Sequence, residues 1–145
     1  MNTVKRNPAV EICSSLLILL FAYTSISKYL NIGSFRFVLH ESPLIHKGAG
    51  VIAWLLPAAE LLIVLLLIIP KFRITGLKIS LVALVLFTSY LIYMVLFAEH
   101  LPCSCGGVIS KMSWGQHIIF NLFFIGIAFV GIKVMKRVPI NKAIT

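Results

Sequence analysis

Four apolar stretches, each long enough to cross a membrane as a helix, constrain the fold of this chain more than any other feature. They span approximately residues 10–30, 49–69, 74–98 and 114–132. A helix rises about 1.5 Å per residue, so about 20 apolar residues cross a hydrocarbon core that is about 30 Å thick. Backbone in lipid must satisfy its own hydrogen bonds, and these stretches are too long and continuous for barrel strands. The sequence therefore predicts an all-α fold, an integral membrane protein built as a four-helix transmembrane bundle.

Little of the chain is left to form anything outside the lipid bilayer. Hydrophobic residues make up 60% of the 145 residues, and charged residues only 12%. We expect residues 1–145 to form a single transmembrane domain. Between the first two apolar stretches, residues 31–48 mix charged residues with apolar residues at helical spacing, which predicts a short interfacial helix that ends near Ser42.

The basic residues predict which way the bundle faces. The chain has a formal net charge of +9, but its Lys and Arg residues gather at helix ends and form no stripe with interleaved aromatics, so we expect no nucleic-acid partner. Nine of the 13 belong to one side, namely Lys5, Arg6, Lys71, Arg73, Lys78, Lys133, Lys136, Arg137 and Lys142. The other side has Lys28, Arg36, Lys47 and Lys111. The positive-inside rule then places both termini in the cytoplasm, in a multi-pass protein of the bacterial inner (plasma) membrane.

The segment "EHLPCSCGGVISKMSWGQHIIFN" (Glu99–Asn121) contains a pair of cysteines, Cys103 and Cys105, that we expect to be catalytic. The pair follows the third apolar stretch, so it faces the exterior, where disulfides persist. A bridge across one residue closes a small, strained ring, which restrains the unfolded chain little and exchanges easily. This favours thiol–disulfide exchange over a structural clip. Cys13 belongs to the opposite face and is too distant to join the pair, so we expect it to be a packed side chain.

The residues around the pair favour a reactive thiolate. Positive charge on His100 or Lys111 would lower the pKa of a nearby thiol. The run "SWGQ" (Ser113–Gln116) matches a capping box. It predicts that the fourth helix begins there, with the positive end of its dipole close to the cysteines.

Two other interpretations of the cysteine pair stay open. The two thiolates, together with His100, His117 or Met112, could hold Cu(I), which prefers soft ligands. The four spaced ligands of a typical zinc site are absent from the sequence, and we assign no metal. The two cysteines could also be a passive or accessory pair.

A layer of polar residues is predicted beneath the cysteines, in the outer half of the bundle. Glu60 is the one carboxylate deep within an apolar stretch, and ionisable groups inside membranes are costly and therefore functional candidates. These polar groups either hold the helices together by hydrogen bonds or form a pocket for a quinone head group or a proton relay. Glu60 is expected to be uncharged unless Lys28 or a histidine reaches it. The candidate residues of the pocket or relay are Glu60, Tyr90, His100, His117 and Asn121.

Four pieces of the sequence, taken in order, resemble the MauE/DoxX group of redox-associated membrane proteins. They are "SISKYL" (25–30), "WLLPAAELL" (54–62), "FTSYLIYM" (87–94) and "CSCGG…SWGQHIIFN" (103–121). Cys103, Cys105 and Gly107 match a Cys-Gly-Cys-Phe-Gly-like loop of MauE-type members, whereas Ser104 and Gly106 depart from it. The resemblance implies a protein that supports disulfide formation together with a periplasmic thioredoxin-like partner.

We therefore expect a thiol–disulfide oxidoreductase of the inner membrane that exchanges disulfides through Cys103 and Cys105 with a thioredoxin-fold protein. In the fuller version of this hypothesis, electrons pass on to a membrane quinone near Glu60, Tyr90 and His117. The alternative is a non-catalytic small subunit or assembly factor of a larger inner-membrane complex, because the sequence shows neither an extramembrane domain nor a second outer cysteine pair.

Overall fold

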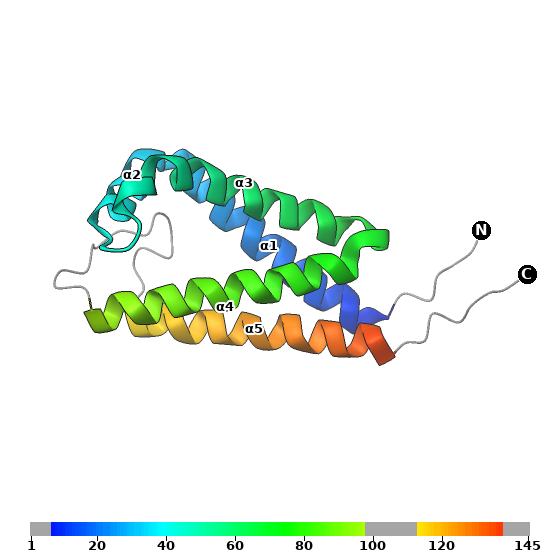
Figure 1. The fold of residues 1–145 in the computed structure, drawn as a ribbon. Coiled ribbons are helices and arrows are strands. Elements are labelled where there is room, and N and C mark those ends of the chain that lie inside the picture. The colour runs from blue at the N-terminus through cyan, green and yellow to red at the C-terminus, as the bar shows by residue number, and fades with distance from the viewer. Residues whose placement is uncertain (1–6, 98–112, 138–145) are drawn as a thin grey trace, which may run out of the picture.

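The computed structural model describes residues 7–97 and 113–137, and most of these residues are helical. The elements are α1 (Pro8–Leu30), α2 (Ile32–Glu41), the 3-10 turn η1 (His46–Gly48), α3 (Ala49–Ile68), the 3-10 turn η2 (Pro70–Phe72), α4 (Arg73–Phe97) and α5 (Trp114–Arg137) (Figure 1). No strand occurs in the described residues. The helices α1, α3, α4 and α5 are each long and apolar enough to cross a membrane. The prediction of an all-α fold with four membrane-spanning helices is confirmed.

Two helix ends differ from the limits of the apolar stretches, and local chemistry accounts for both. Helix α1 begins at Pro8, earlier than predicted, because Asn7 accepts a hydrogen bond from the backbone N–H of Ala9 (3.1 Å) and proline fits the first turn. Helix α5 continues to Arg137 instead of ending near Ile132. Its last turn is basic, which suits the negative end of a helix dipole, and long basic side chains can reach the membrane surface.

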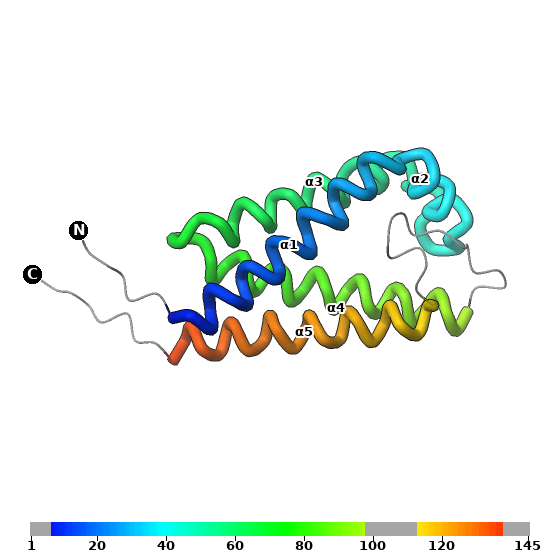
Figure 2. The backbone as a smooth tube through the Cα atoms, turned by 180° about the vertical axis from the view of Figure 1, so that it is seen from behind, coloured from blue at the N-terminus to red at the C-terminus, as the bar shows by residue number. Residues whose placement is uncertain are grey.

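The four long helices form two pairs that diverge. Helix α1 packs mainly against α3, and α4 packs mainly against α5. Figures 1 and 2 show the two pairs close together where α1 begins and α5 stops, and farther apart where α2 lies. We call these regions the terminal end and the α2 end of the bundle. Which compartment each end faces stays a prediction from the basic residues.

The terminal end is closely packed. Leu67 and Leu77 have no exposed surface there. A Cβ added at Gly76 would lie 3.0 Å from the backbone nitrogen of Leu67, so glycine lets α3 and α4 approach closely next to the turn that joins them. An ion pair between Arg73 Nη1 and Glu11 Oε1 (2.8 Å) joins the start of α4 to the start of α1.

Cys13 also lies toward the terminal end. Its side chain is half-buried and forms no disulfide among the described residues. A Cβ added at Gly131 of α5 would lie 3.3 Å from Cys13 Cβ, so a small side chain on α1 meets a glycine on α5. Cys13 is thus part of a close helix contact, in keeping with the packed role expected for it.

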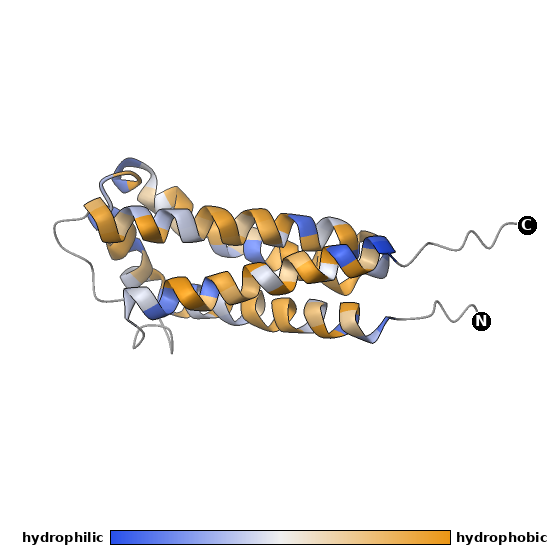
Figure 3. Cartoon of the chain, turned by 90° about the horizontal axis from the view of Figure 1, so that it is seen from below, coloured by the Kyte–Doolittle hydropathy of each residue, from blue (hydrophilic) through white to orange (hydrophobic). Residues whose placement is uncertain are grey.

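Hydrophobic side chains cover the outside of the bundle. Leu19, Leu86 and Ile119 are 69%, 66% and 69% exposed. Figure 3 shows hydrophobic residues along the length of the helices, with hydrophilic residues mostly toward the two ends of the bundle. A water-soluble monomer rarely exposes so broad an apolar surface, whereas a helix that faces lipid must.

Helix α2 packs against the first turns of α3. Phe35 and Leu39 are buried and cluster with Ala49 and Ala53 of α3. The helix is capped at Ser42. The short helix predicted between the first two apolar stretches is confirmed, and it ends where the sequence places its end.

Candidate functional site

A cavity of about 380 Å³ lies at the α2 end, where the two helix pairs diverge. Residues of all five α-helices line it, and most of them are apolar. The hydroxyl, amide and ionisable side chains in its lining are those of Tyr23, Thr24, Ser27, Lys28, Asn31, Glu60, Tyr90, His117 and Asn121. A mostly apolar cavity with a few polar groups is the usual form of a small-molecule site.

The fold brings together most of the residues that the sequence predicts for a pocket or relay. Those that line the cavity are Glu60, Tyr90, His117 and Asn121. They come from α3, α4 and α5, and only the packing of these helices places them around one space. The candidates that lie outside the described residues are His100, Cys103 and Cys105.

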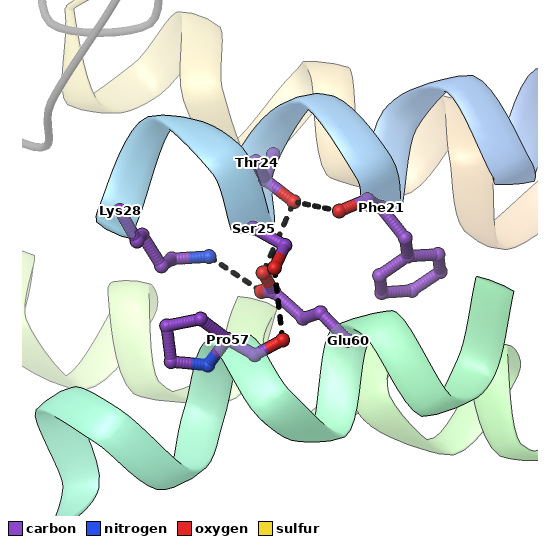
Figure 4. Close-up of polar contacts among 6 residues, drawn as sticks. All are labelled: Phe21, Thr24, Ser25, Lys28, Pro57 and Glu60. Carbon is purple, nitrogen blue, oxygen red and sulfur yellow. Dashed lines mark hydrogen bonds and ion pairs between the residues drawn. The ribbon is translucent and has the colours of Figure 1, made fainter. Parts of the chain in front are cut away.

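Glu60 forms an ion pair with Lys28 between α3 and α1 (Figure 4). Lys28 Nζ lies 2.5 Å from Glu60 Oε1, and Thr24 Oγ1 donates a hydrogen bond to Glu60 Oε2 at 3.3 Å. Only 14% of the Lys28 side chain and 12% of the Glu60 side chain is exposed. The sequence predicts an uncharged Glu60 unless Lys28 or a histidine reaches it. Lys28 does reach it, so the condition for a charged Glu60 is met. The ammonium and the hydroxyl compensate a carboxylate that is largely removed from solvent.

Two aromatic rings also contact the Lys28 ammonium. The ring centroid of Phe35 in α2 lies 5.8 Å from Lys28 Nζ, and that of Phe87 in α4 lies 5.9 Å from it. A ring face within about 6 Å attracts a cation. Groups from α2, α3 and α4 thus converge on one side chain of α1.

A second polar contact joins α1 to α3 one helical turn away. Ser25 Oγ donates a hydrogen bond to the backbone carbonyl of Pro57 at 2.9 Å, in a buried position (Figure 4). Pro57 lies inside α3 and has no N–H of its own to donate. Interhelical hydrogen bonding, one of the two roles expected of the polar layer, therefore occurs next to the cavity.

The α5 wall of the cavity carries His117 and Asn121. His117 is 8% exposed, and its ring centroid lies 5.7 Å from that of Phe87. Asn121 is also buried, and its Nδ2 has no hydrogen-bond partner among the described residues. A buried donor without an acceptor is costly in lipid, which makes this amide a candidate to bind a ligand oxygen.

Helix α4 ends and α5 begins beside the cavity, and the cysteine pair belongs to the chain between them. Met94 and Trp114, close to these two helix ends, line the cavity. The predicted capping box is confirmed, because Gln116 Oε1 accepts from the backbone N–H of Ser113 at 3.0 Å and Ser113 Oγ accepts from that of Gln116 at 3.3 Å. The chain that carries the cysteines is therefore attached at both ends to helices that border the cavity.

Sequence reasoning assigns no role to Phe35 or Phe87, although both contact Lys28. Phe87 precedes Tyr90 by one turn of α4, so the two residues share the face that lines the cavity. Within an apolar stretch nothing distinguishes such a ring from a core residue. Phe35 does have a signal, since it belongs to the apolar face of the short helix α2.

No group of three or more His, Cys, Asp and Glu side chains that could hold a metal ion occurs within residues 7–97 and 113–137. The copper interpretation depends on the cysteine pair, which lies outside these ranges. It stays a prediction.

Comparison with known proteins places the chain in a family. The family model described as "Methylamine utilisation protein MauE" matches residues 6–134, which is nearly the whole chain. The chain belongs to the MauE family. The resemblance to MauE proteins and the multi-pass membrane character are thus confirmed, whereas the DoxX part of the resemblance stays a prediction. Comparison with curated proteins and with solved structures found no match.

Proposed function

We propose that this MauE-family protein is a membrane thiol–disulfide redox protein. Its Cys103–Cys105 pair exchanges disulfides with a thioredoxin-fold partner outside the inner membrane, and its cavity binds the quinone that receives the electrons. The observation that supports this proposal most is the apolar cavity with a few polar groups, bordered by the two helices that carry the cysteine segment between them.

The size and lining of the cavity suit a quinone head group. Its volume of about 380 Å³ is near the lower end of the usual range for ligand sites, roughly 300–1,000 Å³. That is enough for a substituted ring, while an isoprenoid tail would remain in the lipid. Asn121 and His117 on α5 supply groups that can contact ring carbonyl oxygens.

The proposed reaction balances in two steps. A reduced partner first transfers its two electrons to the Cys103–Cys105 disulfide by thiol–disulfide exchange, which leaves the partner oxidised and the pair as two thiols. The two thiols then re-form their disulfide and give two electrons and two protons to the quinone, which becomes a hydroquinone. The net change converts a partner dithiol and a quinone into a partner disulfide and a hydroquinone.

A purified system tests this reaction. The reduced protein is mixed anaerobically with a quinone and a reduced thioredoxin-fold partner, and quinone reduction is followed by absorbance. We expect turnover with the native chain and none with Cys103→Ser, whereas the control Cys13→Ser keeps the native rate because that residue lies toward the terminal end. Absence of quinone reduction with a competent partner present would remove the quinone step.

Alkylation trapping in cells separates the redox function from the alternative of a non-catalytic subunit or assembly factor. A redox protein shows a mixture of thiol and disulfide that shifts when the partner is removed. If Cys103→Ser supports full function in cells, the assembly role is favoured instead.

The proposal also requires the cysteines to face the periplasm and both termini to face the cytoplasm. A membrane-impermeant maleimide added to intact cells, after mild reduction, should label Cys103 and Cys105 but leave Cys13 unlabelled. Labelling of Cys13 alone would reverse the orientation and exclude a periplasmic partner.

A further inference from the structure

We propose that Glu60 sets the charge selectivity of the cavity, so that the cavity admits a neutral ring and rejects an anionic one. This inference rests on the proposed quinone site and names the class of ligand that the site accepts. Glu60 acts here as a specificity-determining residue, because it occupies the position on Lys28 that an anionic ligand would otherwise take.

The charge balance of the lining is the first observation. Among the described residues that line the cavity, Lys28 is the one Lys or Arg and Glu60 is the one Asp or Glu. They are paired at 2.5 Å and are both largely buried. In a poorly solvated site a lone ammonium would attract an anion strongly, and a carboxylate in contact with it removes that attraction.

The contacts of the pair are the second observation. Lys28 is held near the Phe35 and Phe87 rings, and the second oxygen of Glu60 accepts from Thr24. Both carboxylate oxygens therefore face donors of α1, with the Thr24 hydroxyl shared between Glu60 Oε2 and the Phe21 carbonyl. The ammonium has partners from three other helices. An anion that enters the cavity would have to displace Glu60 from these contacts, whereas a neutral ring would not.

The facing groups do not alter this balance. The α4 and α5 walls contribute Tyr90, His117 and Asn121, of which the imidazole is the one able to become cationic. At about pH 8 an ordinary imidazole is neutral, so measurements at that pH report on the Lys28–Glu60 pair.

Binding of matched ligands to the purified full chain in nanodiscs tests the inference. The probes are menadione and an analogue that has the same ring and carries a carboxylate. Binding of each probe is measured by the quenching of Trp114 fluorescence, in a Trp54→Phe background that leaves Trp114 as the one tryptophan. We expect the native cavity to bind menadione more tightly than the anion. Glu60→Gln should raise the affinity for the anion relative to that for menadione by about tenfold or more, the size of a hydrogen bond to a charged group.

A matched control and a reciprocal variant complete the test. Glu11→Gln removes the carboxylate of the other ion pair, with Arg73 at the terminal end, and should change neither affinity. Lys28→Met leaves Glu60 as the unpaired charge, so it should raise the affinity for an ammonium-bearing analogue of menadione and keep the anion excluded. This second variant tests the same charge balance if Glu60→Gln does not accumulate as folded protein.

The inference is overturned if neither single variant changes the charge preference, or if Glu11→Gln changes it equally. Its failure differs from failure of the proposed function. Electron transfer to quinone without any change in charge preference removes the role of Glu60 alone. The predicted charge preference without any electron transfer keeps the selective site and removes the redox step.

Discussion

Each end of the bundle joins α1 to another helix by an ion pair, but the two pairs have different surroundings. At the terminal end, Arg73 contacts Glu11 beside closely packed leucines, and Arg73 Nε also donates to the Leu67 carbonyl at 3.2 Å. At the α2 end, Lys28 contacts Glu60 beside a cavity. The same chemistry joins helices in both places. Only at the α2 end, where the helix pairs diverge, does the ion pair also line a cavity that a ligand could occupy.

The largest expected difference between the ends concerns their carboxylates. Glu60→Gln should lower the free energy of unfolding by about 3 kcal/mol, because it leaves the Lys28 charge largely buried without its partner. Glu11→Gln should cost about 1 kcal/mol or less, because Glu11 is more exposed and loses a more solvated pair. Thermal unfolding in detergent measures both. Equal losses would show that the two pairs are equally buried and would contradict the comparison.

Leucine truncations should show the difference in packing. Leu77→Ala at the terminal end should cost about 2 kcal/mol, because its fully buried side chain leaves a void among close neighbours. Leu91→Ala on the cavity wall should cost about half as much, since part of that side chain already faces empty space and makes fewer contacts. The same unfolding assay compares the two variants, and a larger loss for Leu91 would argue against the cavity.

Two glycine substitutions test how closely the helices approach. Gly76→Ala should lower the free energy of unfolding by about 1.5 kcal/mol, because the new Cβ meets backbone atoms of Leu66 and Leu67 that cannot easily move. Gly126→Ala is the control, since nothing lies within 4 Å of its added Cβ. That control should be neutral or should stabilise the helix by about 0.5 kcal/mol. Unfolding in denaturant measures the free energy of unfolding of both variants. A neutral Gly76→Ala would mean that α3 and α4 lie farther apart than in this structure.

The smallest expected effects concern the helix caps, one at each end. Asn7→Ala and Ser113→Ala should each cost about 1 kcal/mol, because each removes a side chain that satisfies a free backbone N–H. Only Ser113→Ala should also slow disulfide exchange with the partner, because Ser113 closes the segment that carries the cysteines. Stopped-flow exchange kinetics measure this difference, and equal rates in the two variants would separate the cap from the redox site.

The helical part of this architecture is predictable from the sequence because it follows from apolar length. The short helix α2 and the capping box at Ser113 were equally visible, since both depend on local patterns. The predicted polar layer also places Glu60 with Tyr90, both of which line the cavity. Local information does not extend further. The divergence of the two helix pairs creates the cavity. It depends on how side chains pack between helices, and the spacing of residues along the sequence does not predict this packing.

The aromatic contacts show the same limit at the level of single residues. Phe87 is one of many phenylalanines in apolar stretches, and its contact with Lys28 depends on how α4 is rotated against α1. The sequence does not decide whether Lys28 contacts Glu60, because a lysine near a helix end can equally well extend toward water. The cysteine pair differs from these aromatic residues. The sequence alone suggests its thiol–disulfide chemistry, whereas Cys103 and Cys105 lie outside the described residues.

Pro57 has a consequence for how this protein can move. Because proline has no N–H, the Ala53 carbonyl lacks its usual donor within α3, and the helix is easier to bend there than elsewhere. Bending at this point would swing the first turns of α3 together with α2, which packs on them, while the part of α3 that follows Glu60 stayed in place. The missing hydrogen bond thus marks the point at which a bend of α3 would widen or narrow the space around a ligand.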